Sequence, residues 1–120
     1  MTNTRAKGAR AETLARDYII SLGYKIIERN YTIRGGEIDI IASDSNTIVF
    51  FEVKSLIQSS RYQIEEQVTQ EKKKVLIRTC KYWLLKAGKL DSNWRIDFIG
   101  IVYKNNRTDY KLQHITNAIY

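Results

Sequence analysis

The stretch Gly35–Ser55, GGEIDIIASDSNTIVFFEVKS, contains two apolar runs that both carry charged residues. Asp39 lies in the middle of the first run, IDIIA, and Glu52 and Lys54 lie near the end of the second, TIVFFEVK. Runs rich in Ile, Val and Phe are typical of strands, and the Ser45-Asn46 pair between them is typical of a tight turn. The stretch therefore predicts a β-hairpin whose two apolar strands carry three charges.

Two helices and further strands are predicted around this hairpin. A first helix ending at Gly23 is predicted by apolar residues at helical spacing, namely Ala11, Leu14, Ala15, Tyr18, Ile19 and Leu22. A second helix, with Thr69 as N-cap and Gly88 at its end, has the predicted core face Leu76, Cys80, Trp83, Leu84 and Ala87. Strands are predicted at residues 24–33, 37–44, 47–55, 94–103 and 109–116. The order αβββαββ predicts an α/β fold in which helices cover a mixed sheet.

Length and composition are those of one globular domain spanning residues 1–120. Hydrophobic residues make up 43% of the chain and charged residues 28%. The N-terminal segment has no apolar core of a signal peptide, and no apolar run is long enough to span a membrane, so a cytoplasmic protein is expected. The single cysteine, Cys80, excludes an internal disulfide, and with one histidine it excludes the usual zinc sites. His114 is expected to be structural or on the surface.

The net charge of +7 is concentrated in the second predicted helix. The segment Thr69–Lys89 holds seven basic residues against one acid, Glu71, which gives +6. Such a helix suits a polyanion, because each neutralised phosphate releases counterions; a solvated basic face is the alternative on charge alone. The residues expected to bind nucleic acid are Lys72, Lys73, Lys74 and Arg78, together with Arg61 of the preceding loop.

The alternation of side chains along a strand sets the register of the hairpin. With Ser45 and Asn46 as the loop, Asp39 faces Glu52 across the two strands. Glu37 faces Lys54 in the same register. Opposed residues have Cβ atoms roughly 4.5–5.5 Å apart. Two apolar-flanked carboxylates at that distance repel, and one pKa rises unless a cation occupies the site.

A bound metal ion would resolve this repulsion. Glu37, and Glu12 from the first helix, could add further negative charge to the site. All these candidate ligands are oxygens, which favours Mg²⁺ or Mn²⁺ over zinc. The alternative is a surface ladder of salt bridges, with Glu37 pairing with Lys54 and Asp39 with an arginine. The opposed acids, the apolar strands and the neighbouring basic helix together favour the metal site.

An acid on one strand of a hairpin and E-x-K on the next resembles the signature of the PD-(D/E)xK nuclease superfamily, whose restriction-endonuclease-like core runs α, β, β, β, α, β. The chain is more similar still to the YraN family of predicted endonucleases, small bacterial proteins that resemble Holliday junction resolvases. The matching segments are AETLARDYIISLGYKIIERNY, GGEIDIIASD, TIVFFEVKS, EEQVTQEKKKVLI and RIDFIGI.

This resemblance implies roles for individual residues. Asp39 and Glu52 would be the metal-binding carboxylates, and Lys54 would position or activate the attacking water. Glu12 and Glu37 match further family acids that could bind the metal. Lys72 matches a lysine on the second helix, so its ammonium group could reach the site or a phosphate. The implied cofactor is Mg²⁺ or Mn²⁺, and the implied substrate is DNA.

The chain departs from the family pattern at three positions. Ile38 stands at the proline of the superfamily name, Ala11 replaces a glycine, and Leu56 stands where the family commonly has arginine. The first hypothesis is a metal-dependent endonuclease acting on DNA, including branched or repair intermediates, and by analogy a homodimer. The second hypothesis is a nucleic-acid-binding module that keeps the fold without efficient cleavage. The third is a protein whose basic helix docks an acidic partner.

Overall fold

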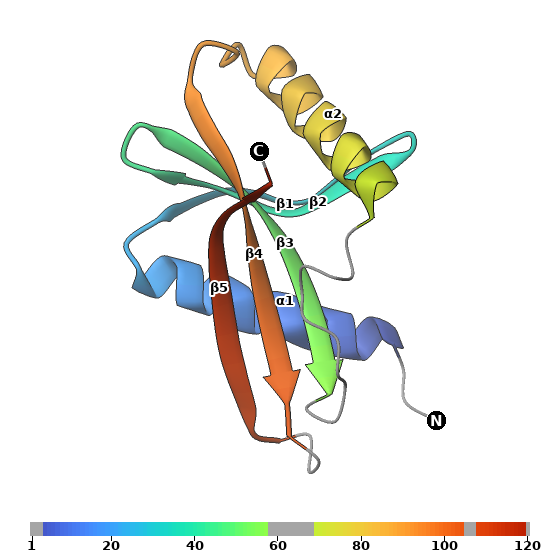
Figure 1. The fold of residues 1–120 in the computed structure, drawn as a ribbon. Coiled ribbons are helices and arrows are strands. Elements are labelled where there is room, and N and C mark those ends of the chain that lie inside the picture. Colours follow the sequence, from blue (N-terminus) through green and yellow to red (C-terminus); the bar gives the residue numbers. More distant parts are fainter. Residues whose placement is uncertain (1–3, 58–68, 105–107, 120) are drawn as a thin grey trace.

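The computed structural model of the chain describes residues 4–57, 69–104 and 108–119 (Figure 1). Two helices and five strands follow one another in the predicted order αβββαββ. Their bounds are α1 Thr4–Ser21, β1 Lys25–Ile33, β2 Gly36–Asp44, β3 Thr47–Ile57, α2 Gln70–Lys86, β4 Asn93–Tyr103 and β5 Tyr110–Ile119. Arg61 lies outside the described residues, so its predicted role in nucleic-acid binding stays a prediction.

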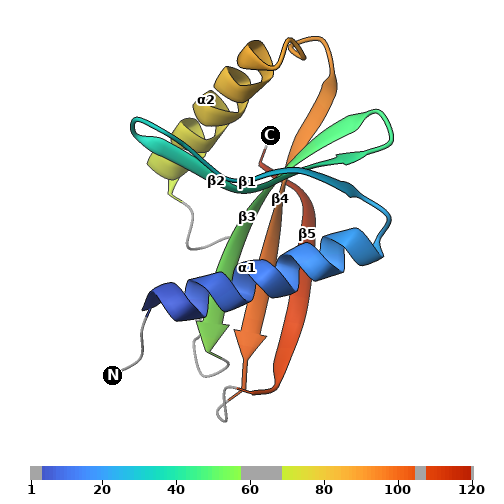
Figure 2. The ribbon, with the colours of Figure 1, turned by 180° about the vertical axis from the view of Figure 1, so that it is seen from behind.

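The strands form one mixed sheet in the order β1-β2-β3-β4-β5. All neighbouring strands are antiparallel except β3 and β4, which run parallel. A parallel pair requires a crossover connection, and α2 is the helix within it. Figures 1 and 2 show α1 crossing one face of the sheet and α2 lying on the other side, beside the hairpin of β1 and β2. This confirms the predicted α/β fold with a mixed sheet flanked by helices.

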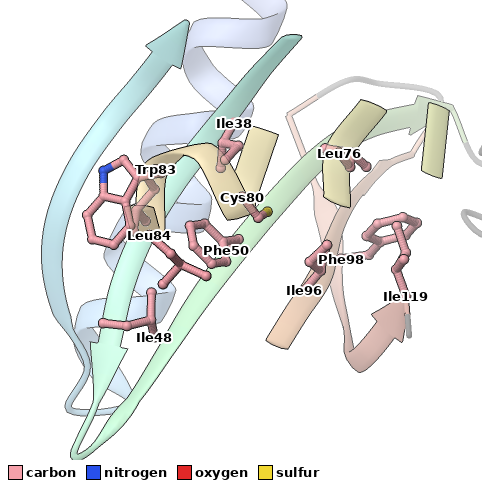
Figure 3. Packing of buried hydrophobic residues seen from close by; sticks show 11 residues of the cluster. Ile38, Ile48, Phe50, Leu76, Cys80, Trp83, Leu84, Ile96, Phe98 and Ile119 are labelled. Atoms are coloured by element: carbon pink, nitrogen blue, oxygen red, sulfur yellow. The ribbon is translucent and has the colours of Figure 1, made fainter. Parts of the chain in front are cut away.

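Each helix covers its own hydrophobic cluster. The α2-side cluster is centred on Phe50, Phe98 and Cys80, and Figure 3 shows Leu76, Trp83 and Leu84 packed with them. The α1-side cluster places Ala11, Ala15 and Ile19 of α1 against apolar residues of the strands, among them Ile40, Val49, Phe51, Ile99 and Ile101. The buried position predicted for Cys80 is confirmed.

The helix ends follow the predicted signals, with two corrections. Thr69 is the N-cap of α2, and its hydroxyl accepts a hydrogen bond from the Lys72 N–H at 3.2 Å. Gly23 and Gly88 follow the helices with positive φ, as helix-ending glycines do. Leu22, predicted on the apolar face of the first helix, and Ala87, predicted on the core face of the second, are exposed instead, because each lies beyond the last turn of its helix. Neither α1 nor α2, as far as the chain is described, is long and apolar enough to cross a membrane.

Candidate functional site

The register predicted for β2 and β3 is confirmed along the paired part of the hairpin. Asp44 pairs with Thr47 across the Ser45-Asn46 turn, and the pairing continues in register to Ile40 and Phe51. It stops there, so the predicted facing pairs Asp39–Glu52 and Glu37–Lys54 are not rungs of the ladder. The reason is that a carboxylate oxygen of Asp39 accepts the Val53 N–H at 2.8 Å, in place of a backbone partner from β2. The two strands part at Asp39.

Strand β2 also twists sharply at Asp39. Residues two apart in a regular strand share a face, yet Ile38 belongs to the α2-side cluster and Ile40 to the α1-side cluster. Asp39 therefore lies where the buried side chains of β2 change from the α2 side of the sheet to the α1 side. This placement explains how Asp39 of β2 and Glu52 of β3 can interact electrostatically with Glu12 of α1.

Asp39 and Glu52 are partly buried carboxylates with raised pKa values. Burial and the charge of Glu52 raise the pKa of Asp39 to about 7, although the Val53 N–H opposes this shift. Burial also raises the pKa of Glu52, with Glu37 adding to the shift and Lys54 opposing it. A carboxyl group that resists ionisation inside a cluster of acids favours the approach of a cation.

Lys54 is the basic group in direct contact with this pair. Its ammonium nitrogen lies 3.1 Å from a carboxylate oxygen of Glu52, two residues earlier on the same face of β3. The predicted alternative of a cross-strand ladder is not found among the described residues, because Lys54 pairs with Glu52 and not with Glu37, and no ion pair joins Asp39 to an arginine. Lys54 is thus held beside the acids by its own strand.

Glu12 reaches the same group of acids from α1. Burial raises its pKa, Arg29 opposes the shift, and Glu37 and Glu52 add to it. A guanidinium nitrogen of Arg29 lies 4.0 Å from Glu12, whose side chain is 19% exposed. The four predicted acids therefore lie within electrostatic reach of one another. Within the described ranges, however, no three His, Cys, Asp or Glu side chains converge as a preassembled metal centre.

A cavity of about 490 Å³ opens beside Glu52 on the α2 side. Glu52 and Lys54 line one wall, and the hairpin tip from Thr32 to Glu37 lines another. The third wall is the first turns of α2 with Glu71, Lys72, Val75 and Leu76. A side chain at Gly36 would collide with Thr79 of α2, so the glycine allows the hairpin tip and the helix to pack closely around the cavity.

The predicted basic residues of α2 divide between the cavity and the surface. Lys72 lines the cavity, and its charge lowers the pKa of Glu52. Arg78 extends toward the hairpin tip, with a guanidinium nitrogen 3.5 Å from the Gly35 carbonyl oxygen. Lys74 is exposed and Lys73 half-buried. Lys72 is therefore the member of the predicted nucleic-acid-binding set that the structure brings to the acids.

A second buried polar cluster lies on the α1 side of β4. The carboxylate of Asp97, fully buried, is within 2.8 Å of His114 Nε2 and accepts from Arg95 Nε at 3.0 Å and from the Asn117 N–H at 2.8 Å. The other ring nitrogen of His114 lies 2.9 Å from the Tyr18 hydroxyl of α1. Burial alone raises the pKa of Asp97, but the bonds from His114, Asn117 and Arg95 outweigh it and hold the pKa below its usual value.

Comparison with known proteins identifies the family. A family model described as uncharacterised protein family UPF0102 matches residues 11–101. The chain belongs to this family. A UPF0102 protein of Geobacter sulfurreducens is 40% identical over 112 residues, covering 92% of this chain and 86% of the relative. A UPF0102 protein of Carboxydothermus hydrogenoformans is 39% identical over 117 residues, 98% of each chain. One of Chlorobium phaeobacteroides is 40% identical over 115 residues, covering 92% of this chain and 91% of the relative.

The part of the chain that matches UPF0102 contains the whole candidate site. Glu12, Asp39, Glu52, Lys54 and Lys72 all lie within residues 11–101, whereas β5 lies outside them. The match confirms the coarser part of the resemblance, to a YraN-like family. Membership of the nuclease superfamily stays a prediction.

Sequence reasoning missed two groups of the site, Arg29 and Asn30, which both lie near Glu12. The signal that could have found Asn30 is its place inside a predicted strand, where asparagine is depleted. Arg29 gave no comparable signal, because a charged residue in a half-exposed strand is common.

Proposed function

We propose that this UPF0102 protein is a metal-dependent nuclease of the PD-(D/E)xK type that hydrolyses phosphodiester bonds in DNA. One observation carries the proposal: two partly buried carboxylates, Asp39 and Glu52, both with raised pKa values, lie where β2 and β3 part. Lys54 lies 3.1 Å from the second of them. Buried acids that lack matching donors are expensive to ionise, so a function that requires a cation there accounts for them.

The residues fit a hard divalent cation. Asp39 and Glu52 would hold it, with Glu12 and Glu37 close enough to influence it electrostatically. Mg²⁺ is commonly bound through one or two carboxylates, with water and substrate phosphate as the remaining ligands, so a third converging protein ligand is not required. The donors are all oxygens, which favours Mg²⁺ or Mn²⁺ over zinc.

Three residues, Asp39, Lys54 and Lys72, have distinct chemical roles in this proposal. When bound, the divalent ion supplies Lewis-acid stabilisation of phosphoryl charge and a water of lowered pKa. Asp39 uses one oxygen for the Val53 N–H, which fixes the carboxylate and leaves its other oxygen for the cation. Lys54 donates hydrogen bonds to the negative charge that develops on the phosphate. Lys72, in the adjoining cavity, pairs with a phosphate oxygen of the substrate.

DNA as the polyanion is supported by the charge of α2 and its surroundings. The segment Thr69–Lys89 has a net charge of +6 in the sequence, and Lys72 brings that charge to the acids. Basic side chains on a helix beside an acidic metal site allow a phosphate backbone to lie between them.

The decisive experiment is a cleavage assay with Mg²⁺ or Mn²⁺ on linear, nicked, flapped and four-way DNA. The wild type is compared with Asp39→Asn, which keeps the shape and an acceptor for the Val53 N–H but removes the charge. Asp91→Asn, at an exposed acid between α2 and β4, is the matched control. We expect metal-dependent cleavage that Asp39→Asn reduces by more than about a hundredfold and Asp91→Asn leaves unchanged. Equal cleavage by both variants would overturn the assignment of Asp39 to the site.

A second candidate function is nucleic-acid binding without efficient cleavage. The observation that favours it is Leu56, which stands at the position of the family's arginine and packs against the α2-side cluster. An apolar residue there removes one expected phosphate contact. Binding of DNA that weakens with salt, together with no cleavage at any metal concentration, would select this function over the first.

A further inference from the structure

We propose that Asn30 is a positioning residue of this site: its left-handed backbone turns β1 and β2 at the level of Asp39, and its side-chain amide holds Glu12 toward the same cation. The inference rests on the proposed metal site and adds a residue to it. Asn30 acts through Glu12 and Asp39, and it is not itself a ligand.

The backbone of Asn30 is the first observation. Its φ of 54° lies in the left-handed region, in the interior of β1. Arg29 pairs with Ile40 and Tyr31 with Ile38, so Asn30 and Asp39 lie opposite one another between these two pairs. Beside Asn30, the side chains of β2 change sides: Ile38 belongs to the α2-side cluster and Ile40 to the α1-side cluster. The two strands therefore twist together where Asp39 leaves the β2–β3 ladder.

The twist changes which side chains of β1 face α1. In a regular strand Arg29 and Tyr31 would share a face, but Tyr31 packs against the α2-side cluster and Arg29 faces Glu12 of α1. Asn30 faces Glu12 as well. Asparagine adopts the left-handed region more readily than most residues, and its side chain is a donor, so one residue supplies both the turn and the contact.

The amide contact is the second observation. With the side-chain nitrogen of Asn30 turned toward Glu12, the orientation that satisfies both groups, it donates to Oε1 at 2.8 Å and to Oε2 at 3.2 Å. Glu12 can use such a donor, because its carboxylate is largely covered, and its charged neighbours are Arg29, at 4.0 Å, and the acids Glu37 and Glu52. The amide donates to the Glu12 carboxylate directly and adds no positive charge to that of Arg29.

The backbone and the amide can be separated experimentally. Asn30→Gly keeps the left-handed backbone, which glycine adopts freely, and removes the amide. Asn117→Gly is the matched control, because Asn117 also has a left-handed φ, of 53°, and contributes to Asp97 only through its backbone N–H. Both variants lose an asparagine side chain from a left-handed backbone position. One position lies beside Glu12 and the other beside Asp97.

The measurement is Mn²⁺ binding by isothermal titration calorimetry, with the melting temperature of each metal-free variant recorded beside it. We expect Asn30→Gly to weaken Mn²⁺ binding about tenfold, as the loss of an outer-shell partner of a metal site typically does. Asn117→Gly should bind as the wild type does, and both variants should melt alike. In a Glu12→Gln background, Asn30→Gly should have no further effect, since the residue works through Glu12.

Three results would overturn the inference. If the wild type binds Mn²⁺ and Asn30→Gly binds it equally well, the positioning role fails while the proposed function stands. If the loss persists undiminished in the Glu12→Gln background, or comes with a larger fall in melting temperature than in Asn117→Gly, Asn30 is a structural residue. If the wild type binds no Mn²⁺, this inference and the metal-dependent function fail together.

Discussion

Asp39 and Asp97 are both aspartates within apolar strands, the first partly and the second fully buried, yet the protein surrounds them in opposite ways. Asp97 has three protein partners, His114, Arg95 and the Asn117 N–H, and its pKa is held below the usual value against the effect of burial. Asp39 has one donor, the Val53 N–H, and its nearest charged neighbours are acids that raise its pKa. The fold thus surrounds one aspartate with hydrogen-bond donors and positive charge, and the other mainly with acids.

The difference is the one expected between a structural carboxylate and the proposed metal-binding one. A buried acid whose oxygens are all satisfied stabilises the fold and joins the elements that supply its donors. A buried acid among other acids costs free energy unless something from outside supplies positive charge. The fold thus supplies the partners of Asp97 from its own residues, whereas the environment of Asp39 would suit the proposed cation.

The largest expected effect comes from breaking the structural side of this comparison. Asp97→Asn should lower the free energy of unfolding by about 3 kcal/mol, because it leaves Arg95 and His114 without their buried anion. Urea denaturation monitored by circular dichroism measures this change. Asp97 touches no group of the candidate site, so the folded variant should still bind Mn²⁺. A loss below about 1 kcal/mol would mean that the cluster is not structural.

The next largest effect is expected at Asp39, where the substitution should stabilise the metal-free protein. Asp39→Asn should abolish the stabilisation that Mn²⁺ gives the wild type, which is about 2.7 kcal/mol at a metal concentration one hundred times the Kd. Without metal the variant should be more stable than the wild type at pH 8, because a carboxylate that is costly to ionise has been removed. Thermal melting with and without Mn²⁺ tests both statements. A metal-free variant less stable than the wild type would contradict the raised pKa.

The two aspartates should also differ in their dependence on pH. The pKa of Asp39 is about 7 in the folded protein, above its ordinary value of 3.8, so folding favours its protonated form. Its contribution to stability is therefore lost as pH rises between these values, with a slope of up to about 1.4 kcal/mol per pH unit. Asp97, with a lowered pKa, contributes stability that is lost only as pH falls below the ordinary value.

Urea denaturation of the wild type and Asp39→Asn at pH 5, 6, 7 and 8, with a chelator present, isolates the Asp39 contribution. The advantage of the variant should grow as pH rises to about 7 and then level off. Mn²⁺ binding by the wild type should weaken as pH falls below about 7, since protons compete for the same carboxylate. Parallel stability curves for the two proteins would rule out this competition.

The sequence predicts the scaffold of the site better than its chemistry. The order of elements, the hairpin register and the Thr69 cap follow from local signals such as apolar spacing, a two-residue turn and a capping hydroxyl. The end of the β2–β3 ladder does not, because it depends on the Asp39 side chain displacing a backbone partner of Val53. Such competition between side chain and backbone leaves no periodic trace.

The sequence also cannot tell the two aspartates apart. Each follows an isoleucine inside an apolar run, IDI in β2 and IDF in β4. Their difference comes from donors that are distant along the chain or revealed only by the fold, such as His114 beside Asp97. The spacing of Leu22 and Ala87 misleads for a related reason, since helical spacing continues in the sequence after the helix has ended.

The smallest effect is expected from a substitution at the edge of the Asp97 cluster, which removes the hydrogen bond between Tyr18 and His114. Tyr18→Phe takes away the hydroxyl that lies 2.9 Å from His114 Nδ1, while the ring can still pack edge-on against the imidazole. The cost should be about 1 kcal/mol, because one hydrogen bond to a half-buried group is lost and the charge of Asp97 keeps its three partners. Urea denaturation measures this cost, and Mn²⁺ titration should give the wild-type affinity. A loss as large as that of Asp97→Asn would show that α1 depends on the Tyr18–His114–Asp97 chain as one unit, since networks of this kind can exceed the sum of their bonds.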